Sequence, residues 1–299
     1  MFSRRRIIWI FLTLWGIWGL AACASLATPT PALTATASST PEPPTATPEP
    51  MALTVNGEGI TFAEFDAEVA RYLAAQKELG KEVSSEDASR AVIEDLIAQL
   101  LLAQAARKNG FTLDEAALQA RIDALAAQIG GAQALSAWMT TQGYTEQTFR
   151  FALKRAAEAA WMRDKIISNV PPTAEQVHIQ QILLYNQDTA QNFLAQLNNG
   201  ADFDELALRA DPLTRGDLGW VPRGYLLDAR IEEAAFRLEV GQYSDVIATN
   251  VGFHIVRVLA RDPNRPLSPD ALLTLQELAL KNWLKEQREL ADVVLAPPP

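Results

Sequence analysis

The hydrophobic pattern divides the chain into stretches of different character. Between residues 61 and 168, apolar side chains recur every three or four positions, which is typical of amphipathic helices. In the stretch 85–109 the apolar face consists of Val92, Leu96, Ile97, Leu100 and Leu101. Helices with a single apolar stripe need one another to bury it, so this region predicts a helical domain.

Capping residues and glycines mark the ends of five helices in this region. Thr61 with Glu64, and Thr112 with Glu115, have the spacing of capping boxes. The expected helices start at 61, run over about 85–109 and 112–130, include 135–139, and run from 145 to about 168. Before them, Asn56-Gly57 between two short apolar runs predicts a hairpin.

From residue 172 to 262 the pattern changes to mixed α and β. Strands are expected at 177–184, 245–249 and 252–259, and helices at 189–199, 203–209 and 230–238, with the stretch 218–221 left without an assigned element after an irregular loop. Helices on a small, mainly antiparallel sheet suit about ninety residues. The expected fold class is therefore α+β.

One more helix is expected after this segment. Ser268 with Pro269 at the first helical position is a strong helix start, and Leu272, Leu275 and Trp283 continue an apolar stripe. A lone helix cannot bury such a stripe, so we expect it to fold back onto the N-terminal helices. Packing on the nearer middle segment is the alternative.

The first residues are typical of an export signal. Arg4-Arg5-Arg6 precedes an uncharged run over 7–22, too short to span a bilayer comfortably. The run ends in Leu20-Ala21-Ala22-Cys23, which resembles a bacterial lipobox, and this resemblance implies that Cys23 is lipidated and begins the mature chain. An uncleaved N-terminal anchor with a chance cysteine is the alternative. Either way the rest of the chain is exported and tethered.

Residues 24–50 are rich in Pro, Thr, Ala and Ser and carry only two charges, Glu42 and Glu49. Such a composition lacks the apolar residues needed to offset ordering entropy, so we expect a disordered spacer. A proline-rich chain rises about 3.1 Å per residue, which gives this tether a reach of roughly 80 Å.

Composition excludes several classes of function. Lys and Arg total 26 against 36 Asp and Glu, for a formal charge of −10, which disfavours nucleic acid as a partner. One cysteine and two histidines exclude a disulfide framework and a zinc or iron–sulfur site made from those residues alone. No metal and no cofactor are expected.

Five motifs in the middle segment, in order, resemble the parvulin-type (PpiC) peptidyl-prolyl cis–trans isomerases. They are residues 200–207 (GADFDELA), 215–220 (RGDLGW), 232–236 (EEAAF), 241–244 (GQYS) and 252–256 (GFHIV). The start of the helical region, 55–65, is similar to the opening of the SurA/PrsA-type exported foldases. The resemblance implies a helical domain completed by the C-terminal helix, with a parvulin-like domain inserted between them.

The resemblance also implies a hydrogen-bonding network beneath the substrate. His254 corresponds to the second of the family's two facing histidines, and Thr249 fits the position that bonds within that network. Gln181 stands where the first histidine is expected, and His178 does not replace it because an odd offset along a strand points to the other face. Glutamine can still hydrogen-bond to His254.

The family's active-site Cys/Asp falls at Asp211 or Pro212, in a loop over 211–214 that looks shortened. Only Asp211 would keep an ionisable group there. The apolar positions implied to line or edge the proline pocket are Leu218, Trp220, Leu226, Ile231 and Phe236. The alternative for each is an ordinary core role. Ile231 stands where the family usually has phenylalanine.

The expected organisation is a signal peptide over 1–22, a tether over 23–51, a helical domain over 52–171, a parvulin-like domain over 172–263 and a C-terminal helix over 264–295. The resemblance implies a lipid-anchored, extracytoplasmic isomerase whose partners are unfolded exported proteins with X–Pro bonds. A parvulin-like chaperone with weak or no turnover is the first alternative, and a lipoprotein scaffold without clients is the second.

Overall fold

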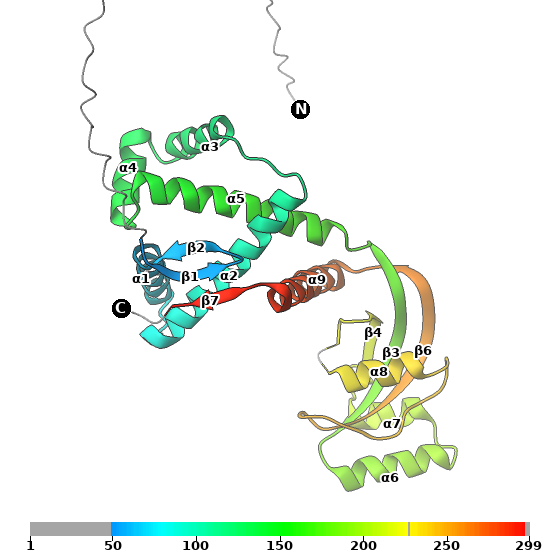
Figure 1. Cartoon of the computed structure of the whole chain (residues 1–299). Coiled ribbons are helices and arrows are strands. Elements are labelled where there is room, and N and C mark those ends of the chain that lie inside the picture. The colour runs from blue at the N-terminus through cyan, green and yellow to red at the C-terminus, as the bar shows by residue number, and fades with distance from the viewer. Residues whose placement is uncertain (1–48, 227, 297–299) are drawn as a thin grey trace, which may run out of the picture. The chain divides into compact units, whose positions relative to one another are not determined.

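The computed structural model describes residues 49–226 and 228–296. Within them the chain forms an α+β fold, with a helical part and a sheet-containing part that is inserted in the sequence between α5 and α9 (Figure 1). No helix in this described portion is long and apolar enough to cross a membrane. The expected signal peptide over 1–22, Cys23 and nearly all of the expected tether lie outside the described residues.

The helical part contains a hairpin followed by five helices, as expected. The elements are β1 (Met51–Val55), β2 (Glu58–Thr61), α1 (Phe62–Glu78), α2 (Ser85–Lys108), α3 (Glu115–Gln128), α4 (Ala132–Thr141) and α5 (Glu146–Ser168). Asn56 and Gly57, with φ of 51° and 81°, form the two-residue turn between β1 and β2. The predicted hairpin is confirmed.

Two of the expected capping boxes are wrong in detail. Thr61 does accept a hydrogen bond from the Glu64 amide at 3.2 Å, but the Glu64 carboxylate binds Arg155 at 2.6 Å. The Glu64 carboxylate therefore forms an ion pair with a buried guanidinium in place of the return bond to the N-cap. Helix α3 starts at Glu115 with Asp114, not Thr112, as its N-cap, because the Asp114 carboxylate accepts from the Ala117 amide at 2.8 Å.

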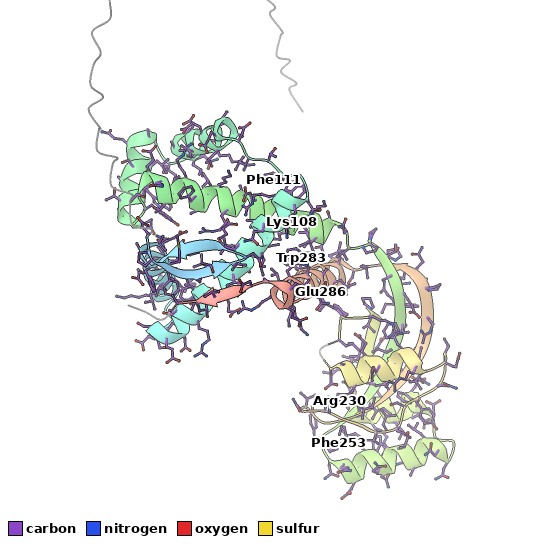
Figure 2. The ribbon with its side chains drawn as sticks, viewed as in Figure 1. Lys108, Phe111, Arg230, Phe253, Trp283 and Glu286 are labelled. Carbon is purple, nitrogen blue, oxygen red and sulfur yellow. The ribbon has the colours of Figure 1, made fainter. Side chains whose placement is uncertain are left out.

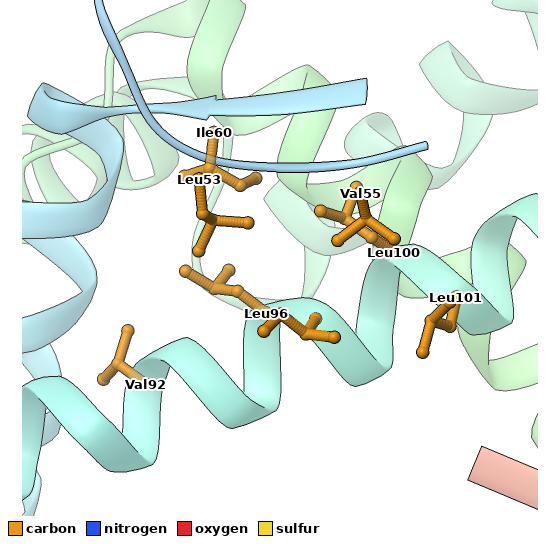
Figure 3. Close-up of a cluster of buried hydrophobic side chains, with 8 residues drawn as sticks. Leu53, Val55, Ile60, Val92, Leu96, Leu100 and Leu101 are labelled. Atoms are coloured by element: carbon orange, nitrogen blue, oxygen red, sulfur yellow. The ribbon is translucent and has the colours of Figure 1, made fainter. Parts of the chain in front are cut away.

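The first core lies under the hairpin. Leu53, Val55 and Ile60 from β1 and β2 are buried against α2 (Figure 3), and the α2 residues are Val92, Leu96, Ile97, Leu100 and Leu101. These five are the apolar face that the sequence pattern predicts. Helix α2 is therefore oriented by the spacing of its own apolar side chains.

The C-terminal helix α9 (Pro269–Leu290) packs on the N-terminal helices, as predicted. A cluster formed by α2 and α5 includes Ala106 and Met162, and Phe111 and Trp283 pack against it (Figure 2). The Gln276 amide reaches the backbone oxygen of Ile167 at 3.4 Å. The apolar stripe of α9 is thus covered by α5 and α2, which end 101 and 161 residues before α9 begins.

The end of the chain differs from the expected helix over 264–295. Helix α9 stops at Leu290, and β7 (Val293–Leu295) pairs with β1, which gives a three-stranded sheet in the order β2-β1-β7. Asn56 positions this strand, because its backbone amide donates to the Asp292 oxygen and its side chain accepts from the Asp292 amide. A β-branched pair, Val293 and Val294, favours the strand over a continued helix.

The inserted part is an antiparallel sheet with three helices. Its elements are β3 (Thr173–Leu184), α6 (Gln187–Asn198), α7 (Phe203–Ala210), β4 (Asp217–Pro222), α8 (Ala229–Arg237), β5 (Ile247–Ala248) and β6 (Phe253–Pro266). The strand order is β4-β3-β6-β5. Each predicted element is present, but β5 is shorter, and β3 and β6 extend beyond the expected bounds.

The long ladder between β3 and β6 explains these extensions. Pairing continues from Leu184 opposite Phe253 to Thr173 opposite Pro266. The buried Gln176 amide donates to the backbone oxygens of Arg265 and Pro266, so a polar side chain holds the far end of the ladder. A polar residue at a strand position weakens the apolar alternation on which the sequence prediction depends.

Alternation along β3 separates two apolar layers. Val177 and Ile179 pack with α8, whereas Ile182 packs with α6 and α7. On β6, Val256 and Val258 belong to the α8 side and Ile255 to the other. The sheet therefore has one face covered by α8 and one covered by α6 and α7.

A buried charge in the helical part gives a stability prediction. The buried Glu158 of α5 pairs with Arg107 of α2, which also binds Glu58 of β2. Arg107→Met leaves the Glu158 carboxylate buried without its cation, so we expect urea unfolding to give a free energy lower by about 2–4 kcal/mol. The control Arg90→Met removes the exposed pair with Glu86 and should change it by less than about 0.5 kcal/mol. Equal losses in the two variants would contradict this account.

Candidate active site

Three polar side chains meet on the α8 face of the inserted sheet. Nδ1 of His254 lies 2.9 Å from Oε1 of Gln181, and Nε2 of His254 lies 2.9 Å from Oγ1 of Thr249. Gln181 comes from β3, His254 from β6, and Thr249 from the turn between β5 and β6. The structure thus joins the three residues of the predicted network into one hydrogen-bonded chain.

Strand register brings these residues together. Gln181 is opposite Val256 and His254 is opposite Leu183, so Gln181 and His254 are diagonal neighbours on the same face. Gly252 makes the turn before His254 possible, because its φ is +152° and a Cβ there would lie 2.6 Å from the Leu184 oxygen. A substitution at Gly252 would therefore push the turn away from β3.

Burial sets the charge of His254. The residue is 3% exposed, and burial lowers the pKa of its imidazole below the ordinary value. The carboxylate of Asp228 acts in the opposite direction and Arg230 in the same direction, both less strongly than burial. The ring is therefore neutral at neutral pH. The structure directs Oε1 of Gln181, an acceptor, toward Nδ1, and this assigns the proton to Nδ1. Nε2 then accepts from the Thr249 hydroxyl at 2.9 Å, in preference to the Gly252 oxygen, which lies 3.2 Å from the same hydroxyl.

Asp228 and Arg230, at the start of α8, are charged neighbours that the sequence motifs do not single out. Arg230 binds both oxygens of Asp228, at 3.0 and 2.7 Å, and this hydrogen bonding lowers the pKa of Asp228 to about 2. Figure 2 labels Arg230. The Asp-x-Arg sequence at a helix start is the signal that could have identified the pair. Together they add little net charge beside His254.

Three of the predicted pocket residues lie in the apolar cluster next to this network. Ile231 and Phe236 of α8 are buried, and Leu226 packs on them from the preceding loop. Val256, which is opposite Gln181, belongs to the same cluster, so the cluster and the polar chain share one face. The role of these side chains in holding a proline ring stays a prediction.

Trp220 does not lie beside this cluster. It is opposite His178 in the β3–β4 pair and stacks on that ring, with centroids 5.5 Å apart. Nε2 of His178 lies 2.8 Å from Asp217, on the face away from Gln181, as the odd offset predicts. The expectation that Trp220 covers the edge of the pocket conflicts with this register.

Leu218 is also outside the cluster. The β3–β4 register shifts between Ile179 opposite Gly219 and Gln180 opposite Asp217, so Leu218 is the extra residue of a bulge. It is 38% exposed. The family resemblance implies a pocket position for Leu218, and a motif match does not show that the residue lies in a bulge.

The carboxylate of Asp211 is hydrogen-bonded within its own loop. Its Oδ1 accepts from the amides of Leu213 and Thr214 at 3.0 and 3.2 Å, and its Oδ2 accepts from the Thr214 hydroxyl. The Thr214 hydroxyl, followed by the loop amides, lowers the pKa of Asp211, so the carboxylate is ionised. Among the described residues, no hydrogen bond joins Asp211 to Gln181 or His254.

Within residues 49–226 and 228–296, no group of three or more His, Cys, Asp and Glu is arranged to hold a metal ion.

The lowered pKa of His254 predicts how stability depends on pH. An unfolded histidine titrates near 6.5 and takes up a proton that the folded ring resists. This contribution to the free energy of unfolding is complete above pH 6.5 and is lost as the pH falls toward the folded pKa. Urea unfolding at pH 7.5 and 5.5 should show a larger acid loss for the natural chain than for His254→Asn. Parallel losses would contradict the assignment.

Two known protein families match successive parts of the chain. Residues 166–260 match the PPIC-type PPIASE domain family, and residues 8–162 match the SurA-like N-terminal domain family. The Foldase protein PrsA of a Geobacillus species is 34% identical over 97 residues, which cover 31% of this chain and 35% of that protein. The chain thus spans about a third of the length of the Geobacillus relatives that it matches.

Other relatives match over more of the chain. The Foldase protein PrsA of Caldanaerobacter subterraneus is 25% identical over 229 residues, 68% of this chain and 71% of that protein. A crystal structure of the peptidylprolyl isomerase PrsA from Bacillus cereus has a TM-score of 0.43 and 18% identity, covering 80% of this chain and 86% of that one. Because the SurA-like match spans slightly more than half of the 299 residues and the PPIC-type match follows it, the chain belongs to the parvulin-type foldases of the SurA/PrsA kind.

Proposed function

We propose that this chain is a peptidyl-prolyl cis–trans isomerase, tethered to the outer face of the cell membrane, that assists the folding of exported proteins. The observation that carries the proposal is the Gln181–His254–Thr249 hydrogen-bond chain, which lies beside an apolar cluster in a PPIC-type domain.

The reaction needs a particular environment rather than a nucleophile. Rotation about an X–Pro bond meets a barrier of about 18–20 kcal/mol, because the twisted amide loses its resonance. A twisted amide is less polar than a planar one, so an apolar surrounding favours it over the ground state. Ile231, Phe236 and Leu226 supply such a surrounding on the face that carries His254.

The hydrogen bonds of His254 define its part in this reaction. Nδ1 donates to Gln181 and Nε2 accepts from Thr249, so neither nitrogen is left to act as a base or a nucleophile. The ring is neutral and fixed in one orientation. Its role is to present an uncharged, rigid floor beside the amide that rotates.

Exported polypeptides with X–Pro bonds are the proposed clients. Uncatalysed isomerisation takes tens of seconds or more, so a folding chain has a slow step to accelerate. The relatives named foldase and chaperone support a role in folding, and the PPIC-type match supports the reaction. The chain needs no charge on its clients for this chemistry.

Tethering is supported by the start of the sequence. The arginines, the apolar run over 7–22 and Cys23 favour export followed by lipidation of Cys23, and the proline-rich segment after it favours a long spacer. The inserted domain would then work at some distance from the membrane surface.

The second candidate is a parvulin-like chaperone that binds unfolded exported clients with little or no turnover. The observation that favours it is Gln181, which stands where the resemblance implies a histidine, next to a shortened loop. Gln181 nevertheless keeps the hydrogen bond to His254, which is why isomerisation is the first choice.

Replacing Gln181 tests the proposed network. Gln181→Leu has a similar size but no acceptor for Nδ1 of His254, whereas Gln181→His restores a hydrogen-bonding ring. Loss of one hydrogen bond that orients the site should lower kcat/KM for a proline-containing tetrapeptide about fivefold to tenfold in Gln181→Leu. Gln181→His should match or exceed the natural chain. If neither the natural chain nor Gln181→His accelerates isomerisation, the enzyme proposal fails.

Refolding of a proline-limited test protein distinguishes the two candidates. Turnover makes the slow phase faster at catalytic amounts of the chain. A chaperone without turnover suppresses aggregation at equimolar amounts and leaves the slow rate unchanged.

Cys23 gives a separate test of tethering. Cys23→Ser should release the chain from the membrane fraction and abolish its labelling by a radioactive fatty acid. The reason is that the proposed acyl chains, which would anchor the chain in the bilayer, are attached to this cysteine. Retention of Cys23→Ser in the membrane would instead support the uncleaved anchor over 7–22.

A further inference from the structure

A hydrogen-bond path connects an exposed loop to Gln181. The hydroxyl of Thr214 donates to Asp211 and accepts from the Gly216 amide at 3.1 Å. The Gly216 oxygen accepts from the backbone N–H of Gln181 at 2.8 Å. Gly216 has φ of +68°, and a Cβ there would lie 1.8 Å from the Gln181 oxygen, so the loop lies directly against β3. The loop over 211–216 therefore positions the residue that orients His254.

A second path leaves the site on its other side. Oγ1 of Thr249, which bonds to His254, also accepts from the Val251 amide at 3.2 Å, and the Thr249 amide donates to the Gly252 oxygen at 2.8 Å. The turn over 249–252 is thus closed by the same hydroxyl that bonds to the imidazole. A displacement of this turn would therefore move the hydroxyl that bonds to Nε2 of His254.

The sheet topology places the two segments on opposite sides of the site. Gln181 and His254 occupy the two central strands, in the order β4-β3-β6-β5. The loop over 211–216 leads into β4 on one side, and the turn over 249–252 joins β5 to β6 on the other. A client whose X–Pro bond lies at His254 and whose chain crosses the strands meets one segment on each side.

Each segment carries an exposed apolar side chain at its tip. Leu213 is 94% exposed and Val251 is 64% exposed. The backbone N–H of Leu213 donates to the Asp211 carboxylate, and that of Val251 donates to the Thr249 hydroxyl. These bonds close the two segments. Because a closed turn holds each of these side chains in water, neither adds buried apolar area to the fold. Covering them with another apolar surface would be favourable by about 25 cal/mol per Å².

We propose that Leu213 and Val251 are specificity-determining residues that contact apolar client side chains on the two sides of the isomerised proline, and that Thr214 is the positioning residue that couples the first contact to Gln181. The proposal rests on the proposed function, because it assumes that clients bind at His254. It adds that recognition extends beyond the proline and its immediate neighbour.

The test uses two peptides with the same Ala–Pro bond: a tetrapeptide, and a peptide of about eleven residues with leucines on both sides of that bond. Binding is measured by calorimetry and exchange between cis and trans by NMR. Leu213→Ser and Val251→Ser should each weaken binding of the longer peptide about threefold to tenfold and leave the tetrapeptide unchanged. Both residues are exposed, so neither change removes a buried contact.

Matched variants separate this effect from general damage. Val240→Ser is the control, because Val240 is also exposed, at 56%. Its neighbour Gly241 donates a backbone hydrogen bond to Val258, which lies four residues along β6 from His254. The change should alter the binding of neither peptide. Thr214→Val loses the hydroxyl and should slow exchange of both peptides about threefold to tenfold with unchanged binding. Thr214→Ser keeps the hydroxyl and should retain the natural rate.

Three results would overturn the proposal. They are unchanged binding of the longer peptide in Leu213→Ser and Val251→Ser, an equal loss for the tetrapeptide, and an equal loss in Val240→Ser. If the natural chain binds the longer peptide without accelerating exchange, the isomerase proposal fails, while the affinities still decide whether Leu213 and Val251 contact the client.

Discussion

The site depends on keeping one imidazole ring buried, neutral and fully hydrogen-bonded. A buried polar nitrogen without a partner destabilises a fold by about 1–3 kcal/mol, and His254 has two nitrogens to satisfy. Gln181 and Thr249 satisfy both, from two different elements. The long ladder between β3 and β6 fixes the first bond, and the turn closed at Gly252 fixes the second. The ring is therefore held from both sides by the sheet and by the turn that precedes β6.

Glutamine at position 181 changes the electrostatics of the network without breaking it. Two facing histidines share protons, and their charge state depends on pH and on each other. With Gln181 as the partner, only His254 titrates, and its burial keeps it neutral. The adjacent Asp228 and Arg230 bind each other and add little net field. The result is a site whose polarity is set by hydrogen bonds rather than by a charge.

Much of this arrangement follows from the sequence, because it is encoded locally. The apolar spacing of α2, the Asn-Gly hairpin and the Ser268-Pro269 helix start each predict an element that the structure contains. The three network residues were predicted from their place in family motifs, and the register of β3 and β6 brings them together. Leu226, Ile231 and Phe236 gather beside them because α8 presents one apolar face.

What the sequence did not predict depends on contacts between distant segments or on local irregularity. The bulge at Leu218 and the stacking of Trp220 on His178 follow from strand register, which residue alternation alone does not specify. Strand β7 exists because Asn56 and β1 receive it, about 240 residues away in sequence. Asp211 belongs to a loop whose hydrogen bonds close on themselves, and a motif position cannot distinguish that from a carboxylate aimed at substrate.

The central claim is that His254, oriented by Gln181 and Thr249, lies beside the amide that rotates. Nitrogen NMR of the imidazole, recorded with and without an Ala–Pro peptide in cis–trans exchange, tests this most directly. The account predicts a neutral ring protonated at Nδ1, whose resonances shift on peptide addition while exchange of the peptide accelerates. Accelerated exchange with unmoved His254 resonances, or a ring protonated to the cation at neutral pH, would contradict it.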